Sequence, residues 1–282
     1  MVGFRLKVLI LCISQYVMKE ITSPNNTFIK SLLVLRDKSK ERRSSGKFIF
    51  EGIRELKLAV TAGYHIDSLL SCNEICEPET QKELLEINAR EYIQISLPVF
   101  KKLALRASTE GVIVVAQAKP HHLDQLKFKT KSPLILVAEA PEKPGNIGAI
   151  LRTADAAKVD AVLIANSKTD VYNPNIIRSS VGCLFTNTMG LGSTQEIVDF
   201  LKQHNIAIYS AILQDATAYT SQDYTGPSAI VVGTEDQGLS ATWRDQATAC
   251  IKIPMGGAID SMNVSVAAGI LVFEAVRQRN AN

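Results

Sequence analysis

From residue 133 to the C terminus, short apolar runs alternate with glycine-bearing loops and helical patterns, and this rhythm restricts the possible fold more than any other feature. The apolar runs predict strands at 134–138, 161–165, 206–211, 229–232 and 250–253. Helical patterns occur at 147–157, 194–203 and 263–278. Because the strands are apolar throughout and alternate with helices, we expect an α/β domain with a mostly parallel sheet covered on both faces.

The preceding part of the chain has a different, mixed pattern. Its apolar spacing predicts helices at 28–35, 53–62 and 97–107 and strands at 48–50, 66–71 and 112–116. A polar stretch with little periodicity follows, which we interpret as a linker. The expected organisation is therefore an N-terminal extension (1–23), a smaller α/β domain (24–118), a linker (119–132) and the larger α/β domain (133–282).

Composition and cysteine usage narrow the class of protein. The 282 residues are 46% hydrophobic and 21% charged, which excludes a disordered chain, a collagen-like fibre and a multi-span membrane protein. The five cysteines are scattered without a CxxC pair, and the four histidines have no metal-ligand spacing, so we expect no bound metal. Reduced thiols are typical of a cytoplasmic protein. The apolar run at 8–13 is too short for a signal peptide or a membrane span, and Met18 is an alternative start.

Charge is unevenly distributed along the chain. Residues 1–120 carry a net charge of +5 and residues 121–282 a net charge of −2. The segment 36–47, RDKSKERRSSGK, concentrates six basic residues and ends in small residues that suggest mobility. Such a segment suits RNA phosphates, although charge runs are more often solvated surface. The candidate RNA-binding residues are Arg36, Lys38, Lys40, Arg42, Arg43 and Lys47.

Three loops of the second domain combine glycine with polar side chains. In the first, Asn146 is placed to cap a helix that carries Arg152 one and a half turns later. In the second, a buried strand runs into Gly233, and Glu235 and Gly238 follow. Its acidic group disfavours a phosphate and favours a neutral or cationic ligand. Taken alone, the first loop is better explained as an ordinary capped helix with a surface arginine, and the second is a weak signal because glycine-rich turns are common.

The third loop leads into the terminal helix. Gly256 and Gly257 form an irregular turn, Asp260 or Ser261 can begin the helix, and Asn263 adds a further polar group near its start. Residues 264–273 are apolar almost all round, which predicts a fully buried helix. Burial against a second subunit and burial within one subunit are both open at this point.

In order and spacing, the segments NIGAILRTADA, VVGTEDQGLS and IPMGGAIDSMNVSVAAGILVFEA resemble the three signature motifs of the SpoU/TrmH family. These are S-adenosylmethionine-dependent RNA ribose 2′-O-methyltransferases of the SPOUT superfamily. The resemblance implies a C-terminal domain with a deep trefoil knot and a homodimer formed through that domain. More loosely, the first domain, including KFIFEGIRELKLAV at 47–60, resembles the L30e-like substrate-binding domain of the family.

The resemblance also implies which residues form the site. The catalytic candidates are Asn146, Arg152, Glu235, Ser261 and Asn263. The residues expected to bind S-adenosylmethionine are Ala211, Ile212, Leu213, Gly233, Gly238, Ile253, Gly256 and Met262. The chain departs from the family pattern at Lys158 and Asp236, where glycine is frequent, and at Met262, where leucine is usual.

The implied function is methylation of a ribose 2′-hydroxyl in RNA, with 23S ribosomal RNA favoured because of the separate basic first domain. A tRNA methyltransferase and an inactive RNA-binding paralogue are the alternatives. A Rossmann-type methyltransferase and a P-loop NTPase are disfavoured, because neither GxGxxG after a strand nor GxxxxGK[ST] occurs.

Overall fold

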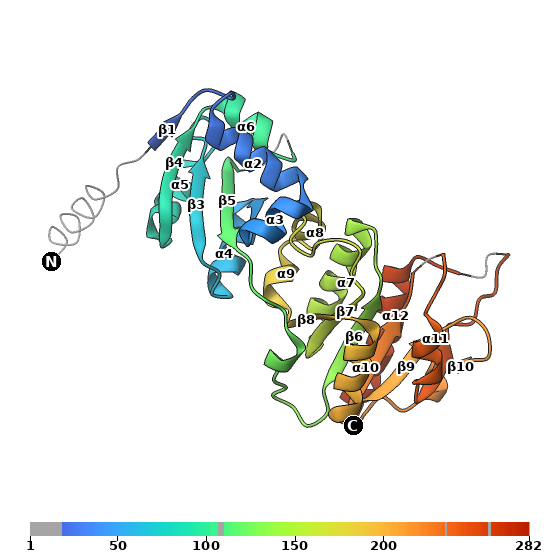
Figure 1. Cartoon of the computed structure of the whole chain (residues 1–282). Helices are drawn as coiled ribbons and strands as arrows, with labels where there is room; N and C mark the ends of the chain where they lie inside the picture. The colour runs from blue at the N-terminus through green and yellow to red at the C-terminus, as the bar shows by residue number, and fades with distance from the viewer. Residues whose placement is uncertain (1–18, 107–109, 235, 259–260, 282) are drawn as a thin grey trace, which may run out of the picture. The chain divides into compact units, whose positions relative to one another are not determined.

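The computed structural model describes residues 19–106, 110–234, 236–258 and 261–281, and the chain divides into two compact units between Lys119 and Pro120 (Figure 1). We call them the N-terminal and C-terminal units. Each has its own sheet. Among the described residues, no helix is both long enough and apolar enough to span a membrane.

The N-terminal unit is a five-stranded mixed sheet with the strand order β1-β4-β3-β5-β2. β5 runs antiparallel to β2 and β3, whereas β4 runs parallel to β1 and β3. The strands are β1 (Lys19–Ile21), β2 (Lys47–Glu51), β3 (Ile66–Ser71), β4 (Ala89–Ile95) and β5 (Val112–Gln117). The helices are α2 (Thr27–Asp37), α3 (Ser39–Ser45), α4 (Ile53–Thr61), α5 (Pro78–Glu86) and α6 (Leu97–Leu103).

Three features of this unit differ from the sequence expectation. Residues 19–21, assigned to an N-terminal extension, form an edge strand paired with β4. β4 itself was not predicted, because charged residues interrupt its apolar pattern. Residues 39–45, expected to be mobile, form α3, which ends at Gly46 in the left-handed conformation that closes many helices.

The C-terminal unit contains a seven-stranded sheet in which every pair of neighbours is parallel. The strand order is β10-β12-β9-β11-β6-β7-β8. The strands are β6 (Leu134–Glu139), β7 (Ala161–Ala165), β8 (Met189–Gly192), β9 (Ala207–Ala211), β10 (Thr217–Ala218), β11 (Ser228–Val232) and β12 (Ala249–Lys252). The helices are α7 (Pro144–Ala157), α8 (Pro174–Ser179), α9 (Cys183–Thr186), α10 (Thr194–Gln203), α11 (Ala241–Asp245) and α12 (Val264–Asn280), with short 3₁₀ turns η1 (Leu123–Gln125) and η2 (Tyr219–Ser221).

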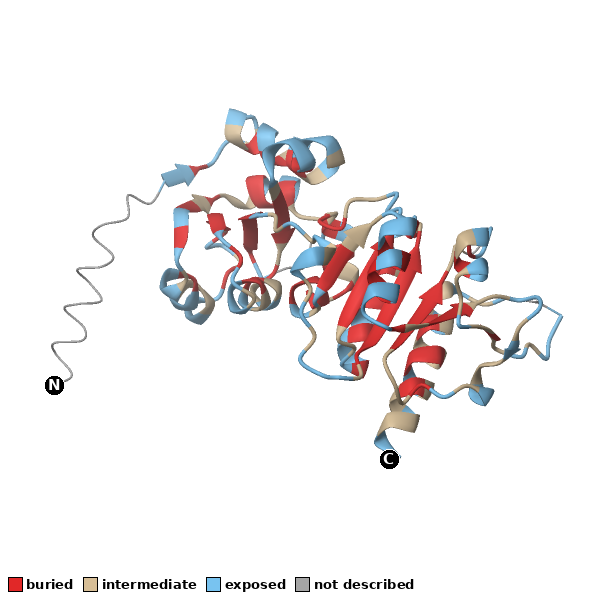
Figure 2. Ribbon diagram, turned by 60° about the horizontal axis from the view of Figure 1, so that its bottom comes forward, coloured by how far each residue is buried: buried red, intermediate tan, exposed pale blue. Residues whose placement is uncertain are grey.

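Helices cover both faces of this sheet, which confirms the expectation of a parallel α/β domain. Alternate strand residues such as Val137, Leu163 and Val231 pack against α10 and against Trp243 of α11. The intervening residues face the other side, where α7 and α12 lie against each other and against β6, β7 and β11. The strands at the centre are consequently buried along their length (Figure 2).

The expected linker is packed onto the C-terminal unit. Leu123, Leu126 and Phe128 contact its core. A Cβ atom on Gly190 of β8 would lie 2.8 Å from a methyl carbon of Leu123 and 3.0 Å from one of Leu126, so a larger residue there would force these leucine side chains to shift. The linker therefore covers the outer strand β8, which sequence reasoning missed because it is short and contains two glycines.

The terminal helix α12 is buried on one face only. Ala268, Leu271, Val272 and Ala275 lie in the core. By contrast, the side chains of Val266 and Phe273 are 53% and 47% exposed. Their positions seven residues apart place them on the same outer face. Burial within one subunit thus fails to cover this helix.

Candidate active site

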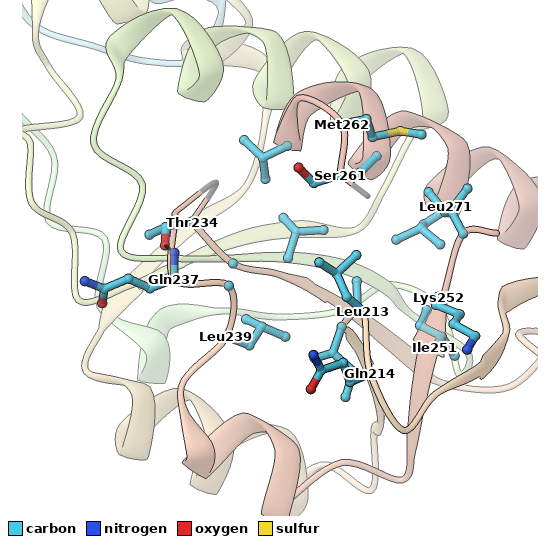
Figure 3. Close-up of a pocket in the computed structure, with 18 of the residues that line it drawn as sticks. Leu213, Gln214, Thr234, Gln237, Leu239, Ile251, Lys252, Ser261, Met262 and Leu271 are labelled. Carbon is cyan, nitrogen blue, oxygen red and sulfur yellow. Dashed lines mark hydrogen bonds between the residues drawn. The ribbon is translucent and has the colours of Figure 1, made fainter. Parts of the chain in front are cut away.

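A cavity of about 290 Å³ lies at the carboxyl ends of β9, β11 and β12 (Figure 3). Its walls come from the residues after β9, from the loop 233–239 after β11, and from the segment between β12 and α12. The carboxyl ends of parallel strands are where open α/β sheets bind ligands. Most of the wall is apolar, contributed by residues such as Ile212, Leu239 and Leu271.

The loop 233–239 owes its shape to two glycines. The backbone amides of Thr234 and Gly238 each donate to the other residue's carbonyl, at 3.2 and 3.0 Å. A Cβ atom on Gly233 would lie 2.3 Å from the carbonyl of Gly238, and Gly238 has a φ of +66°. A larger residue at either position would open or strain this narrow turn.

Seven of the eight residues predicted to bind the cofactor line this cavity; they are Ala211, Ile212, Leu213, Gly233, Gly238, Ile253 and Met262. Gly256 is not among the lining residues, although the neighbouring Met255 is. Sequence reasoning missed Leu239, Ile251 and Leu271, whose apolar side chains complete the wall. One signal for these three residues was available in the sequence, their position near the motif glycines. Their residue types provided none, because leucine and isoleucine are equally common in an ordinary core.

The first motif loop differs from the expectation at its helix start. Asn146 was predicted to cap the helix, but α7 begins at Pro144 with Lys143 as its N-cap. The reason is that proline fits the first helical position, where its missing amide hydrogen costs nothing. Asn146 is therefore the third helical residue.

Two of the catalytic candidates meet directly across the fold. The Nδ2 of Asn263 donates to the Oδ1 of Asn146 at 3.1 Å. Asn263 also caps α12, with its Oδ1 accepting from the backbone amide and the hydroxyl of Ser265 at 3.0 and 2.6 Å. This corrects the expectation that Asp260 or Ser261 begins the terminal helix.

The other catalytic candidates are placed differently. Ser261 lines the cavity. Arg152 is exposed on α7 and is not among the residues that line it. Glu235 lies outside the described residues. The structure of one unit thus brings together Asn146, Asn263 and the Ser261 loop, and leaves Arg152 on the outer surface.

A buried carboxylate that the sequence analysis did not single out supports the second motif loop. Glu139 ends β6 and is 6% exposed. Its Oε1 accepts from the hydroxyls of Thr194 and Ser240, both at 2.7 Å, and its Oε2 accepts from the amide of Ser240 at 2.7 Å. These bonds compensate for the burial of the charge and tie the loop after β11 to β6 and α10. The only sequence signal was an acidic residue at the end of an apolar strand.

The basic segment of the N-terminal unit is less available than its sequence suggests. Arg42 is buried, and its guanidinium donates to the carbonyls of Leu35 and Arg36 at 2.9 and 2.7 Å, so we withdraw it as an RNA contact. Arg36 itself donates to the carbonyls of Lys102 and Leu103. Lys47 forms an ion pair with Asp67. Lys38, Lys40 and Arg43 are exposed.

A parallel α/β unit whose strand-end cavity is built by these motif loops defines the class of SpoU-type RNA methyltransferases. The model of the SpoU rRNA methylase family matches residues 133–273, and that of the MRM3-like substrate binding domain matches residues 26–114. The chain belongs to the SpoU rRNA methylase family and is a methyltransferase of that family.

Similar proteins match over nearly the whole chain. The 23S rRNA (uridine(2479)-2′-O)-methyltransferase of Streptomyces viridochromogenes is 30% identical over 93% of this chain and 93% of its own length. A crystal structure of an RNA 2′-O ribose methyltransferase superposes with a TM-score of 0.80 at 39% identity, covering 93% of this chain and 99% of the other. The crystal structure of the SpoU methyltransferase AviRb of S. viridochromogenes in complex with AdoMet superposes with a TM-score of 0.84 at 27% identity. The match covers 92% of this chain and 100% of the other.

Proposed function

We propose that this protein transfers a methyl group from S-adenosylmethionine to a ribose 2′-hydroxyl of 23S ribosomal RNA. One observation carries the proposal: the second and third motif loops form a cavity at the strand ends, and the Asn146–Asn263 hydrogen bond joins the first motif to the third beside it. Relatives whose names specify 23S rRNA 2′-O-methylation match the chain along both units.

The cavity suits the methyl donor chemically. Apolar side chains such as Ile212 and Leu239 can sandwich the adenine ring. Asp236 at the rim favours the positive sulfonium, while Arg244 and Lys252 favour the amino-acid carboxylate. When bound, the donor supplies a methyl group already activated by its sulfonium. The protein then has to bind the donor, exclude water and orient the hydroxyl, which is mainly positional catalysis.

We assign Arg152 to orientation of the RNA. A guanidinium rarely gives up its proton and is a poor general base. Its planar fork matches a phosphate with two parallel hydrogen bonds. We therefore infer that Arg152 clamps the phosphate next to the target ribose, and that the hydroxyl proton leaves to phosphate, water or a neighbouring polar group.

The exposed face of α12 supports a homodimer through the C-terminal unit. Val266 and Phe273 leave apolar surface in solvent, on a helix that packs against α7, where Arg152 is exposed. A second copy covering this face would bury the apolar residues. It would also place Arg152 of one subunit at the cavity of the other, which accounts for its absence from its own cavity.

Finer features of the fold belong to the same proposal. We assign the C-terminal unit a deep trefoil knot, as the membership of the chain in the SpoU family implies. The N-terminal unit is assigned as an L30e-like RNA-binding domain in which Lys38, Lys40 and Arg43 contact phosphates. The free thiols of Cys72, Cys76, Cys183 and Cys250 support a cytoplasmic location.

The test is ribose-methylation mapping of total RNA from a strain that lacks the gene. Loss of one methyl group in 23S rRNA, restored by the wild-type gene, is the expected result. Loss of a methyl group from tRNA instead would favour the alternative substrate. An inactive RNA-binding paralogue predicts no change in methylation and no calorimetric binding of S-adenosylmethionine, which distinguishes it from both enzymes.

A further inference from the structure

A second cavity, of about 350 Å³, lies beside the first in the C-terminal unit. Its walls come from residues 138–143 and Asn146, from Asn166 and Lys168 after β7, and from residues 233–234 and 236–240 after β11. Its volume is at the lower end of the range of roughly 300–1,000 Å³ for small-molecule sites.

Strand order explains why a cavity forms there. β6 and β11 are neighbours in the sheet. After β6 the chain passes through α7 to β7, on one side of this pair, and after β11 it passes through α11 to β12, on the other side. Loops that diverge in this way leave a crevice, and such topological switch points are where open parallel sheets bind ligands. The second cavity is thus a predictable consequence of the topology.

The two cavities share one wall. The loop 233–239 and Val264 line both. Asn146 lines only the second, and its Oδ1 accepts from Asn263. A group held in the second cavity therefore lies next to a donor in the first, and a ribose placed where the shared residues line both cavities can approach the methyl group directly.

The charges of the lining favour a neutral ligand. Three carboxylates line the cavity, Glu139, Glu142 and Asp236, against two lysines, Lys143 and Lys168. Lys168 is paired with Glu142 at 2.6 Å. A phosphate, or the carboxylate of a methyl donor, would meet net repulsion here. A nucleobase is neutral and hydrogen-bonds through donors and acceptors on its edge.

A carboxamide is in place to contact such an edge. Gln237 lines both cavities, and Figure 3 shows its amide turned away from Leu213 and Met262 of the first cavity. That amide makes no hydrogen bond with any residue that the structure describes. By contrast, Glu139 in the floor is saturated by Thr194 and Ser240, and acts as a rigid support.

We propose that the second cavity receives the base of the target nucleotide, extruded from the RNA, and that Gln237 contacts its edge. Enzymes that modify a nucleotide within folded nucleic acid commonly move it out of the stack into a pocket. With the base held there, its ribose lies at the shared loop, facing the donor. This inference rests on the proposed function and adds where the nucleotide binds and what selects it.

The experiment uses the full-length protein and RNA oligonucleotides that contain the nucleotide found by methylation mapping, made with each of the four bases at that position. Gln237→Ala, Gln237→Glu and the control Gln203→Ala, an exposed glutamine on α10 outside both cavities, are compared with wild type. The readouts are kcat/KM for each base and the calorimetric Kd for S-adenosylmethionine. A third readout, taken without donor, is the fluorescence of 2-aminopurine at the target position.

We expect Gln237→Ala to lower discrimination between the best and the next base by about tenfold. Gln237→Glu, which keeps an acceptor and loses a donor, should change the order of base preference. In both variants the change in base preference should exceed any change in the Kd for S-adenosylmethionine, because the amide of Gln237 is turned away from Leu213 and Met262 of the first cavity. Wild type and Gln203→Ala should raise 2-aminopurine fluorescence on binding, because an extruded base loses its stacking neighbours.

Wild-type base preference in both Gln237 variants would overturn the inference, as would fluorescence that stays quenched with the wild-type protein. A weaker Kd for S-adenosylmethionine with unchanged RNA kinetics would assign the cavity to the donor and also overturn it. If mapping finds no lost methyl group, the proposed function itself fails, which is a separate result.

Discussion

Asn146 and Asn263 are 117 residues apart in the chain, yet the Nδ2 of Asn263 lies 3.1 Å from the Oδ1 of Asn146. The contact joins the third residue of α7 to the N-cap of α12. It therefore links the first and third motif loops at one edge of the sheet, beside the segment that carries Ser261.

The contact can be tested without removing the helix cap. Asn263→Asp keeps an oxygen that accepts from Ser265 but loses the amide that donates to Asn146. We expect kcat/KM to fall at least about tenfold, equivalent to about 1.4 kcal/mol, with little change in unfolding free energy. Steady-state kinetics and urea unfolding measure the two effects. Asn263→Ala, which also removes the cap, should lose about 1 kcal/mol of stability in addition. Unaltered kinetics in Asn263→Asp would show that the contact has no role in the reaction.

The clamp assigned to Arg152 makes a prediction for a charge-conserving variant. Arg152→Lys keeps the positive charge but loses the two-pronged hydrogen bonding, so kcat/KM should fall at least about tenfold. Because Arg152 is exposed, the thermal unfolding temperature should be unchanged. Near-normal turnover of RNA by Arg152→Lys would rule out the clamp.

Lys158 ends α7 with a φ of +52°, in the left-handed region that favours glycine. Glycine adopts this backbone conformation without strain, so it suits this position better than lysine does. We expect Lys158→Gly to raise the free energy of unfolding by about 1 kcal/mol, measured by urea denaturation. The control Lys202→Gly, within α10, should instead lower it by about 1 kcal/mol. A loss of stability in Lys158→Gly would contradict this explanation.

Phe273 tests the subunit interface assigned to α12. Its side chain is 47% exposed in the single chain, so Phe273→Asp should fold normally but weaken dimerisation at least about tenfold. Sedimentation equilibrium measures the association. Val34→Asp is a matched control, because Val34 is a similarly exposed apolar residue on α2 of the N-terminal unit. A Phe273→Asp variant that dimerises like wild type would place the interface elsewhere.

Glu274 should make the free energy of unfolding depend on pH in the acid range. Hydrogen bonds from Arg277 and Gln278 lower its pKa from 4.5 to about 2. The folded state therefore binds fewer protons than the unfolded state between these values, and stability falls as the pH is lowered through this window. Glu274→Gln should flatten this part of the curve of unfolding free energy against pH, because the group that changes its pKa on folding is removed. Equal slopes in wild type and Glu274→Gln would refute the assignment.

Much of the C-terminal unit could be predicted from the sequence. The strand β7 and the helix α10 match their expected bounds, and the strands β6, β9, β11 and β12 differ from theirs by one or two residues. Their apolar runs are uninterrupted, unlike that of β4 in the N-terminal unit, which went unpredicted, as did α5. The three motif loops and most of the residues lining the cavity were also accessible, because each loop follows a buried strand directly.

Other features depend on partners that are distant in the chain. Arg42 lies in a basic run typical of a surface, but its guanidinium is buried because it donates hydrogen bonds to two backbone carbonyls at the end of α2. In the sequence, Glu139 resembles an ordinary polar residue at a strand end. Only the structure shows that the hydroxyls of Thr194 and Ser240 donate hydrogen bonds to its carboxylate. The second cavity exists only because β11 is inserted between β9 and β6.

The sequence by itself therefore determined the elements and the motif loops, because periodicity, apolar runs and turn residues act over a few neighbouring positions. The tertiary structure alone decided that Asn146 meets Asn263, that Arg42 is buried, and that two cavities share one loop. These depend on strand order and on long-range hydrogen bonds, which local patterns do not encode.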